Sequence, residues 1–331
     1  MDRGPIFVGG LDHSGKTLMR LSLSSHPNIA MTRRTYMWRR FYNRYGDLSR
    51  PANFERCLAA MLRYRHIRFL QPDPERLRRE FRQGEPAYAR LFALFHEHYA
   101  ERLGKPRWGE QLGLVERYAD LIFAAYPTAK MVHLIRDPRD RYTASLVSSR
   151  PRIRLGKVGE ATAGWLYSAR LAKRNRQCYP ERYLILHCEA LISRREETLR
   201  RVCAFLNEDF VPAMLTLEGA IRFGEAGDKK PNEKLDWDSV AAALSQRTRQ
   251  LMSKREMAFM QAFAGRDMKA YGYELEPIRL SLGNRLWFYF GDWPANIARM
   301  VGWRTWDILQ HRIGRAPSPH TIVAEDRVSQ T

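Results

Sequence analysis

The sequence predicts an α/β fold in which helices flank a central parallel sheet. Two short apolar runs bounded by turn signals, residues 5–8 and 130–135, are typical of strands buried on both faces, and residues 107–111 and 183–187 are further candidates. A helical pattern follows each run, and strands that alternate with helices indicate a parallel sheet with right-handed crossovers. The length of 331 residues predicts one large domain or one domain with additions.

Composition excludes several classes of protein. Apolar residues make up 44% of the chain and aromatic residues 11%, which excludes a disordered or low-complexity protein. The net charge of +20 favours anionic ligands, nucleic acid or an acidic membrane surface. The 4 cysteines form no CxxC and have no histidine at metal-ligand spacing, so we expect neither disulfides nor a zinc site. With no recognisable signal peptide or membrane span, we expect a cytoplasmic protein.

The first strand leads into a phosphate-binding loop. Residues 10–17 read GLDHSGKT and match G-x-x-x-x-G-K-[ST], and the loop stands between a buried strand and a helix that continues with Leu18. Gly10 and Gly15 let the backbone turn and approach an anion. Successive N–H groups and the helix N-terminus supply partial positive charge. We therefore predict that a phosphorylated ligand binds here.

Residues 33–105 have a different pattern, with helices dense in arginine and aromatic residues. We predict helices over 54–70, 74–82 and 86–103. The aromatic stripe in the last of these has helical spacing and indicates packing rather than a ligand site. We interpret the segment as a helical insertion that covers one end of the sheet.

The strand at 130–135 leads into a second anion site. Arg136 ends this strand, and Pro138 suits the first position of the next helix. Because α/β folds bind ligands at the carboxyl ends of their strands, we expect Arg136 to point into that crevice. A hydroxyl on the first turns of the following helix can add a hydrogen bond to a phosphate. The charged residues at 139–141 are expected to be solvated.

Helices predicted over 196–206 and 240–263 complete a domain that we place at 1–278. A loop rich in Gly, Pro and Asn precedes Trp237 and carries several lysines. Lys234 is our candidate there for closing over a nucleotide, and a solvated loop is the alternative. Trp165 and Trp237 are expected in the core rather than stacked on a base.

Residues 279–316 form an amphipathic tail in which 4 tryptophans are interleaved with arginines. Two interpretations stay open. We favour a helix docked on the core, because Pro294 interrupts the amphipathic pattern. The alternative is peripheral contact of residues 280–315 with membrane headgroups. Residues 317–331 are polar, and we expect them to be disordered.

Together, the two phosphate motifs resemble those of the sulfotransferase family that uses 3′-phosphoadenosine-5′-phosphosulfate, nearest to the tyrosylprotein and related bacterial sulfotransferases. Residues 5–27, up to His26 and Pro27, resemble the family's 5′-phosphosulfate loop and following helix, and Arg136 with a downstream hydroxyl resembles its 3′-phosphate site. Further similarity lies at 108–110, 188–191, 204–206 and 271–274. The resemblance implies a P-loop-type sheet, this nucleotide as sulfuryl donor, and no metal.

The resemblance also implies site residues. The family's 3′-site serine falls on Ala144, so Thr143 or Ser145 takes its place, and we prefer Ser145. The residues expected to bind the donor are Gly10, His13, Ser14, Gly15, Lys16, Thr17, Leu18, Arg136, Thr143, Ser145 and Lys234.

The sequence departs from the family where catalysis is concerned. His13 stands where the family usually has Arg or Lys, and Lys16 stands where it usually has Thr. Arg33 and Arg34 stand where the tyrosylprotein enzymes have a catalytic glutamate. Arginine cannot act as a general base. We therefore take Glu110 and His13 as candidate bases, with Lys16 and Arg33 stabilising the charge that develops on the leaving group.

The acceptor is less visible in the sequence. Arginine-rich helices beside the crevice favour an anionic acceptor, and we expect a hydroxyl of a glycan or glycolipid. One alternative is a P-loop ATP-dependent kinase, but Arg136 lies where a magnesium site needs a carboxylate. Another is a sulfotransferase-like binding protein without catalysis. We do not expect nucleic acid as a partner, because the chain shows no signature of a nucleic-acid-binding module.

Overall fold

The structure is a computed structural model that describes residues 3–149, 151, 153–220, 237–245 and 249–312. Its centre is a 5-stranded parallel sheet in the order β2-β3-β1-β4-β5. The predicted α/β fold is thus confirmed. The strands are β1 Ile6–Gly9, β2 Ile29–Thr32, β3 Arg107–Gln111, β4 Lys130–Ile135 and β5 Tyr183–His187.

Sequence analysis missed β2, one of the two edge strands. Its 4 residues read IAMT, a run too short to be separated by periodicity from the helix before it. The other four strands lie where the apolar runs predicted them, with β1 displaced by one residue.

The helices divide among the connections between strands. Those around the sheet are α1 Lys16–Ser24, α2 Met37–Arg40, α3 Pro51–Arg63, α4 Arg65–Arg68, α5 Pro74–Arg82, α6 Tyr88–Arg102, α7 Ala119–Ala125, α8 Pro138–Ser149, α9 Lys157–Cys178, α10 Cys188–Ser193, α11 Arg195–Leu206, α12 Ala213–Thr216 and α13 Trp237–Ser245. The C-terminal ones are α14 Lys254–Ala270, α15 Leu282–Trp287 and α16 Trp293–Arg312, and short 3-10 turns lie at η1 Val115–Tyr118 and η2 Arg249–Leu251.

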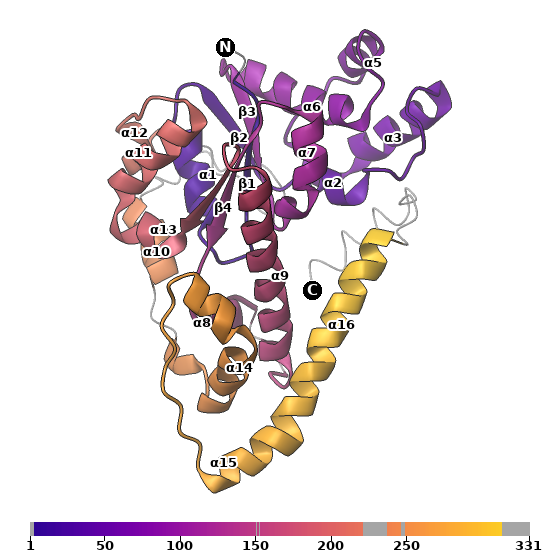
Figure 1. Ribbon diagram of the computed structural model, residues 1–331. Coiled ribbons are helices and arrows are strands. Elements are labelled where there is room, and N and C mark those ends of the chain that lie inside the picture. The colour runs from indigo at the N-terminus through magenta and orange to yellow at the C-terminus, as the bar shows by residue number, and fades with distance from the viewer. Residues whose placement is uncertain (1–2, 150, 152, 221–236, 246–248, 313–331) are drawn as a thin grey trace.

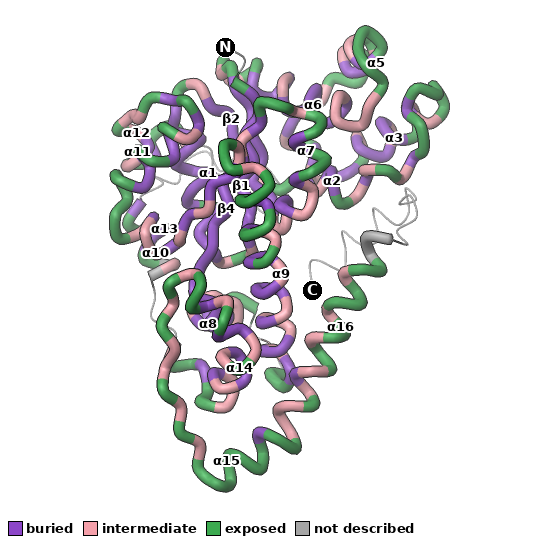
Figure 2. The backbone as a smooth tube through the Cα atoms, viewed as in Figure 1, coloured by how far each residue is buried: buried purple, intermediate pink, exposed green. Residues whose placement is uncertain are grey.

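The two faces of the sheet enter different cores. In β1, Phe7 joins the aromatic-rich core shared with α2, α6 and α7. Ile6 and Val8 point the other way and join the core shared with α1, α11 and α13. Figure 2 shows the strands buried in the middle of the molecule. Because β1 is central, the loop that follows it lies at the middle of the carboxyl edge of the sheet.

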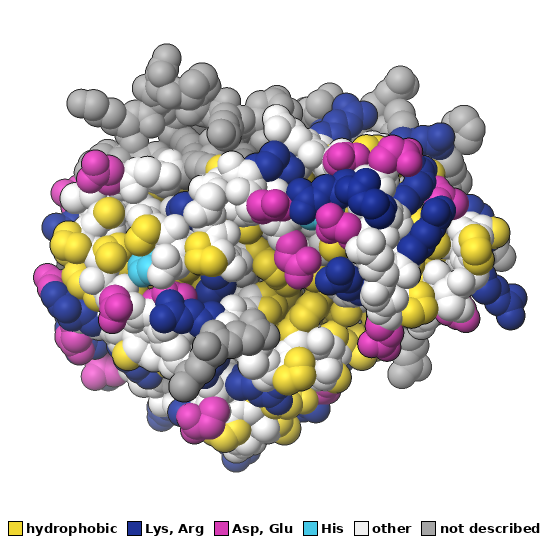
Figure 3. All heavy atoms as spheres, turned by 90° about the horizontal axis from the view of Figure 1, so that it is seen from above, with side chains coloured by type: hydrophobic (Ala, Val, Ile, Leu, Met, Phe, Trp, Pro, Cys, Tyr) yellow, Lys and Arg dark blue, Asp and Glu magenta, His cyan; other side chains and the backbone are white. Residues whose placement is uncertain are grey.

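The segment 33–105 is helical, as predicted, and α5 has the predicted bounds. The helix predicted over 54–70 splits into α3 and α4, because Tyr64 has extended backbone (φ −77°, ψ 120°). In Figure 3, Lys and Arg side chains gather on one side of the molecule with Asp and Glu among them. On α5, for example, Arg78 pairs with Glu55 at 3.0 Å, so acidic partners offset part of the positive charge.

The single helix predicted over 240–263 is wrong. Helix α14 begins only at Lys254, because Ser253 and Glu256 form a capping box in which each side chain accepts the backbone N–H of the other. The 22-residue α9 was not predicted either.

The C-terminal tail is docked. After α15 and a π-helical turn, η3 Phe288–Asp292, helix α16 runs beside α9 (Figure 1). Asn296 Oδ1 accepts the backbone N–H of Gly159 at 2.9 Å, and a Cβ on Gly159 would lie 2.2 Å from the Asn296 carbonyl oxygen. Pro294 follows the π-helical turn at 288–292, which takes up the local irregularity, and the helix continues through it to Arg312, so the proline does not end the amphipathic helix.

The domain boundaries at 278/279 and 316/317 stay predictions, and residues 317–331 lie outside the described part of the chain. Within the described residues, no helix has both the length and the apolar character that crossing a bilayer requires.

Candidate functional site

The phosphate loop has a backbone that only glycine can follow at two positions. Gly10 has φ 108°, and a Cβ there would lie 2.2 Å from the carbonyl oxygen of Leu134. Gly15 has φ 90°, and its Cβ would lie 2.8 Å from Cys188 Sγ. Positive φ and close contact thus both exclude a side chain. Neighbouring strand ends therefore define the shape of this loop.

At the start of α1, Ser14 donates to the carbonyl oxygen of Leu11 at 2.6 Å, which ties the loop to itself. Thr17 is exposed at the first turn, whereas Leu18 is buried in the core. The N-terminus of α1 thus presents its amides and the Thr17 side chain to the crevice.

Lys16 is only 4% exposed, and its Nζ lies 3.2 Å from Asp12 Oδ1. Burial lowers the pKa of Lys16, and the neighbouring Asp12 carboxylate opposes that shift. Lys16 in turn holds the pKa of Asp12 well below its usual range. Sequence analysis missed Asp12, although it lies within the motif. Arg34 acts electrostatically on both groups, and the role of Arg33 in stabilising the leaving group stays a prediction.

The buried carboxylate of Glu116 holds the phosphate loop in place through hydrogen bonds. Glu116 Oε2 accepts the backbone N–H of Gly10 at 3.1 Å, and its Oε1 accepts the hydroxyl of Ser168 at 2.6 Å. The Glu116 carbonyl oxygen accepts Asn175 Nδ2 at 2.7 Å. No sequence pattern pointed to Glu116, because its role depends on α9, more than fifty residues away.

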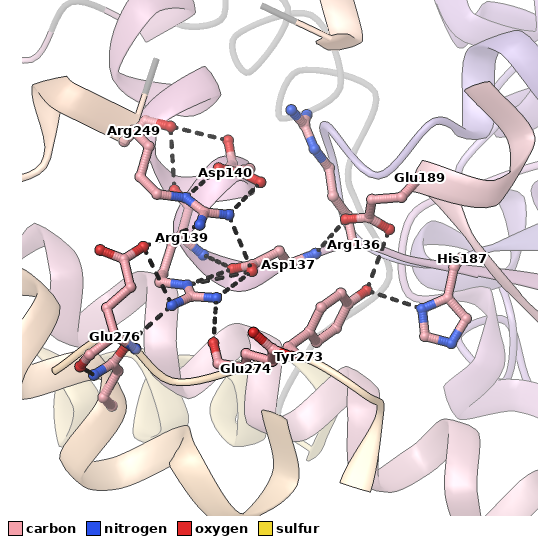
Figure 4. Close-up of polar contacts among 12 residues, drawn as sticks. Arg136, Asp137, Arg139, Asp140, His187, Glu189, Arg249, Tyr273, Glu274 and Glu276 are labelled. Atoms are coloured by element: carbon pink, nitrogen blue, oxygen red, sulfur yellow. Dashed lines mark hydrogen bonds and ion pairs between the residues drawn. The ribbon is translucent and has the colours of Figure 1, made fainter. Parts of the chain in front are cut away.

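Arg136 lies against the phosphate loop. Its guanidinium donates to the carbonyl oxygens of His13 at 2.8 Å and Leu244 at 2.6 Å. In Figure 4 its side chain turns away from the ion pairs around Asp137. A small hollow beside it is also lined by Ser14 and Arg141. The two phosphate motifs therefore meet in one place.

Arg141 adds a second cation next to this hollow. Its Nε–H is buried and donates to no partner among the described residues, and burial lowers the pKa of Arg141 to about 10. A buried guanidinium with an unpaired N–H favours an anionic ligand nearby.

The hydroxyls predicted for the second anion site are held within α8. Thr143 is buried and donates to the carbonyl oxygens of Arg139 and Asp140 at 3.1 Å each. Ser145 donates to the carbonyl oxygen of Tyr142 at 2.6 Å. Ser148, which sequence analysis missed, lies 3.3 Å from His13 Nε2.

His13 has a positive φ of 65° and is half-buried. Burial lowers its pKa, and the cations around it act in the same direction. At neutral pH, His13 is therefore in its neutral form and able to accept a proton.

The expectation of solvated charges at 139–141 is wrong for Arg139, which is 2% exposed. Arg139 pairs with Asp137 at 2.6 Å, and Arg249 pairs with both Asp137 at 3.2 Å and Asp140 at 2.8 Å (Figure 4). This network fixes the turn between β4 and α8.

The same figure shows how two other segments meet at this turn. Glu189 Oε1 accepts the backbone N–H of Asp137 at 2.9 Å, and its Oε2 accepts the Tyr273 hydroxyl at 3.4 Å. His187 Nδ1 lies 3.2 Å from the same hydroxyl. Residues near 188–191 and 271–274 thus help to hold the end of β4.

Glu110 is fully buried at the end of β3. Its Oε1 accepts both the backbone N–H and the hydroxyl of Thr35, and Oε2 has no partner among the described residues. Burial raises the pKa of Glu110 to about 7, although the bonds from Thr35 oppose the shift. This geometry suits a group that holds the segment after β2, and it keeps the carboxyl away from the crevice surface.

The remaining predicted positions say less about the site. Lys229, Lys230 and Lys234 lie outside the described residues. Trp165 and Trp237 are buried, as expected of core residues, and Trp165 Nε1 donates to the Arg136 carbonyl oxygen at 2.9 Å. Across the described ranges, no group of 3 or more His, Cys, Asp or Glu side chains is placed to hold a metal.

Comparison with known families decides the identity of this fold. The sulfotransferase family model matches residues 5–212, from β1 to the start of α12. The chain belongs to the sulfotransferase family.

Solved sulfotransferases share its fold. The sulfotransferase domain of the Synechococcus PCC 7002 olefin synthase is 19% identical, with a TM-score of 0.53 over 83% of this chain and 98% of that domain. The sulfotransferase domain from the curacin biosynthetic pathway is 17% identical, with a TM-score of 0.52 over 82% and 99%. No curated protein matches the sequence.

Proposed function

We propose that this sulfotransferase transfers a sulfuryl group from 3′-phosphoadenosine-5′-phosphosulfate to an acceptor hydroxyl. The observation that carries the proposal is the contact between Arg136 and the phosphate loop, 2.8 Å from Nη1 to the His13 carbonyl oxygen. One nucleotide with its phosphosulfate in the loop and a 3′-phosphate beside Arg136 satisfies both motifs. The buried, unpaired Nε of Arg141 supports the same assignment.

The residues of the chain divide between the two ends of such a donor. The amides at the start of α1, Lys16 and the exposed Thr17 would bind the 5′-phosphosulfate, and Arg136 with Arg141 would bind the 3′-phosphate. During transfer, the sulfur–oxygen bond to the donor's phosphate breaks and a bond from sulfur to the acceptor oxygen forms. Lys16 stabilises the negative charge that collects on the departing phosphate oxygen.

A base must also take the acceptor proton. His13 is neutral at pH 7 because its pKa is lowered, and Asp12 is an exposed carboxylate beside Lys16. Both lie in the phosphate loop, but Lys16 holds the pKa of Asp12 well below its usual range, which makes this carboxylate a weak base. We therefore favour His13 over Glu110, which is fully buried and bonded to Thr35.

The kinase alternative needs a carboxylate that is free to hold magnesium. At the end of β4 the candidate is Asp137, but it pairs with Arg139 at 2.6 Å and Arg249 at 3.2 Å. Two guanidinium partners oppose metal binding there. This argues for a donor bound by cationic side chains.

For the acceptor, we propose a hydroxyl of a glycan or glycolipid. The loss of the glutamate at Arg33 and Arg34 separates the chain from the tyrosylprotein enzymes it otherwise resembles. The arginine-rich helices between β2 and β3 favour an anionic acceptor.

The test is transfer of sulfur label from the donor to a panel of glycans in the presence of a chelator. We expect metal-independent transfer with release of 3′-phosphoadenosine-5′-phosphate. Transfer of phosphate from ATP that requires magnesium would overturn the proposal. Tight binding of the nucleotide with no transfer to any acceptor hydroxyl would instead support the non-catalytic alternative.

We also propose that the tip formed by α15 and η3 contacts an anionic membrane surface. Phe290 is 81% exposed and Leu282 79%, and Trp287 and Tyr289 are also exposed there. Arg285 stands among them, which suits acidic headgroups. Sedimentation with phosphatidylglycerol vesicles should decrease in Phe290→Asp. Equal binding of both proteins, or self-association that the substitution abolishes, would contradict the proposal.

A further inference from the structure

A groove leads away from the phosphate loop between α16 and the segments after β2 and β3. Its inner part has a volume of about 170 Å³, and Tyr36, Gly113, Trp303 and Trp306 are among its lining residues. A Cβ on Gly113 would lie 3.7 Å from Lys16 Nζ. The inner end of the groove therefore adjoins the cation that we assign to the transferred group.

The groove continues into a second, larger hollow of about 510 Å³. Arg39, Arg117, Tyr118 and Asp307 line both parts, so the two hollows adjoin each other. Arg44 also lines the outer part. Ligand sites in proteins commonly enclose about 300–1,000 Å³, so the groove is large enough for an acceptor longer than a single sugar ring.

Helix α16 forms one wall, and its position is fixed by contacts to the rest of the protein. Asp307 Oδ1 accepts Arg117 Nη2 at 2.8 Å. The Trp303 ring packs on Tyr167 with centroids 5.9 Å apart, and Arg304 lies 4.4 Å above the same ring. This wall is therefore formed before any ligand arrives.

Trp306 differs from its neighbours on this wall because it is 63% exposed although it lines the groove. An indole ring held open beside a polar groove suits the apolar face of a sugar ring. Arg39 and Arg44 lie along the same groove, and guanidinium groups bind carboxylates in paired hydrogen bonds. The Asp307 charge is already offset by Arg117 and Arg304.

We propose that this groove is the acceptor site, that α16 is one of its walls, and that its occupant is an acidic glycan packed against Trp306. The inference rests on the proposed function, because the groove is assigned to an acceptor only if Lys16 binds the donated group. It assigns the C-terminal tail a role in binding the acceptor, whereas the two phosphate motifs concern only the donor.

The test measures glycan binding in the presence of saturating 3′-phosphoadenosine-5′-phosphate. The probe is an unsulfated chondroitin tetrasaccharide, observed by saturation-transfer NMR and calorimetry, with neutral maltotetraose as comparison. Trp306→Ala should weaken binding of the acidic probe about tenfold or more. Trp287→Ala removes an equally exposed indole, 60% against 63%, from the tip outside the groove and should change nothing.

Arg39→Gln supplies a second variant, because Arg39 is exposed at the surface and the substitution leaves the helix intact. It should reduce the preference for the acidic over the neutral glycan. Unchanged thermal unfolding of both variants excludes a general loss of structure.

Three results would overturn the inference: no binding of either glycan, equal loss in the Trp306 and Trp287 variants, or Trp306-dependent binding of an acidic tyrosine-containing peptide instead. If the nucleotide itself fails to bind, the proposed function fails. If the nucleotide binds and the acidic glycan does not, only the acceptor assignment fails.

Discussion

Replacing Glu110 by Gln distinguishes a buried positioning group from a general base. The carboxyl is fully buried, and burial raises its pKa from 4.5 to about 7. The folded state therefore binds the proton more tightly than the unfolded state. Between these two pKa values, the contribution of Glu110 to stability falls as the pH rises.

The size of the effect follows from this difference in pKa. Each pKa unit corresponds to about 1.4 kcal/mol, so the ionised carboxylate lowers the free energy of unfolding by about 3 kcal/mol above pH 7. Glutamine keeps the oxygen that accepts from Thr35 but cannot ionise. Relative to wild type, Glu110→Gln should thus gain more than about 2 kcal/mol between pH 5 and pH 8.5.

Urea denaturation of both proteins at the two pH values measures this gain, and sulfuryl-transfer rates on the same preparations measure catalysis. We expect kcat to stay within a few-fold of wild type. A stability difference that is independent of pH would refute the raised pKa. A drop in kcat of about 10²–10⁴-fold would show that Glu110 is the base.

Three further outcomes follow from the geometry of the loop and the turn. Gly15→Ala should lower the free energy of unfolding by about 1–3 kcal/mol, as measured by urea denaturation, and adding Cys188→Ala in the same chain should restore part of that loss. Strictly additive effects of the two substitutions would contradict the close contact between positions 15 and 188. His13→Asn keeps a residue that tolerates positive φ, so the fold should survive while calorimetry shows weaker binding of 3′-phosphoadenosine-5′-phosphate; equal affinity would remove His13 from the site. Arg139→Ala should lower the free energy of unfolding by about 1.5–3 kcal/mol, because the buried Asp137 carboxylate loses its shortest ion pair but keeps Arg249 at 3.2 Å, and a loss below about 0.5 kcal/mol would mean that the ion pair with Arg139 is not needed.

Local motifs explain why the donor side of the site could be predicted. The loop at 10–17 and Arg136 each follow a buried apolar strand, and parallel strands bring their carboxyl ends to one edge. Sequence spacing is enough to infer that geometry. The position of β2 was missed because 4 residues carry too little periodicity.

Residues that depend on distant partners could not be predicted in this way. The sequence around Arg139 is typical of a surface charge, and Arg139 is buried only because Arg249 and the segment at 274–276 pack around it in the fold. Glu116 reaches Gly10 only because η1 passes under the loop. For Glu110, the sequence gives the carboxylate at a strand end, and the tertiary fold alone determines that it is buried against Thr35.

Local patterns favoured a docked C-terminal helix over membrane contact, and the structure shows α16 docked. They did not show which surface of the protein it packs against. The decisive contact is the one between Asn296 and Gly159 of α9, a helix that sequence analysis did not identify. The groove beside Trp306 therefore became visible only in the structure.

The central claim is that one nucleotide joins the phosphate loop to Arg136. Calorimetry without metal should compare 3′-phosphoadenosine-5′-phosphate with adenosine 5′-monophosphate for wild type, Arg136→Ala and the remote charge control Arg170→Ala, whose residue is exposed and pairs with Asp267. We expect Arg136→Ala to lose about 10- to 10²-fold in affinity for the bisphosphate, with little change for the monophosphate, because a charged hydrogen bond contributes about 1.5–3 kcal/mol. Equal loss for both nucleotides, or a preference for magnesium ATP that ignores Arg136, would contradict the account.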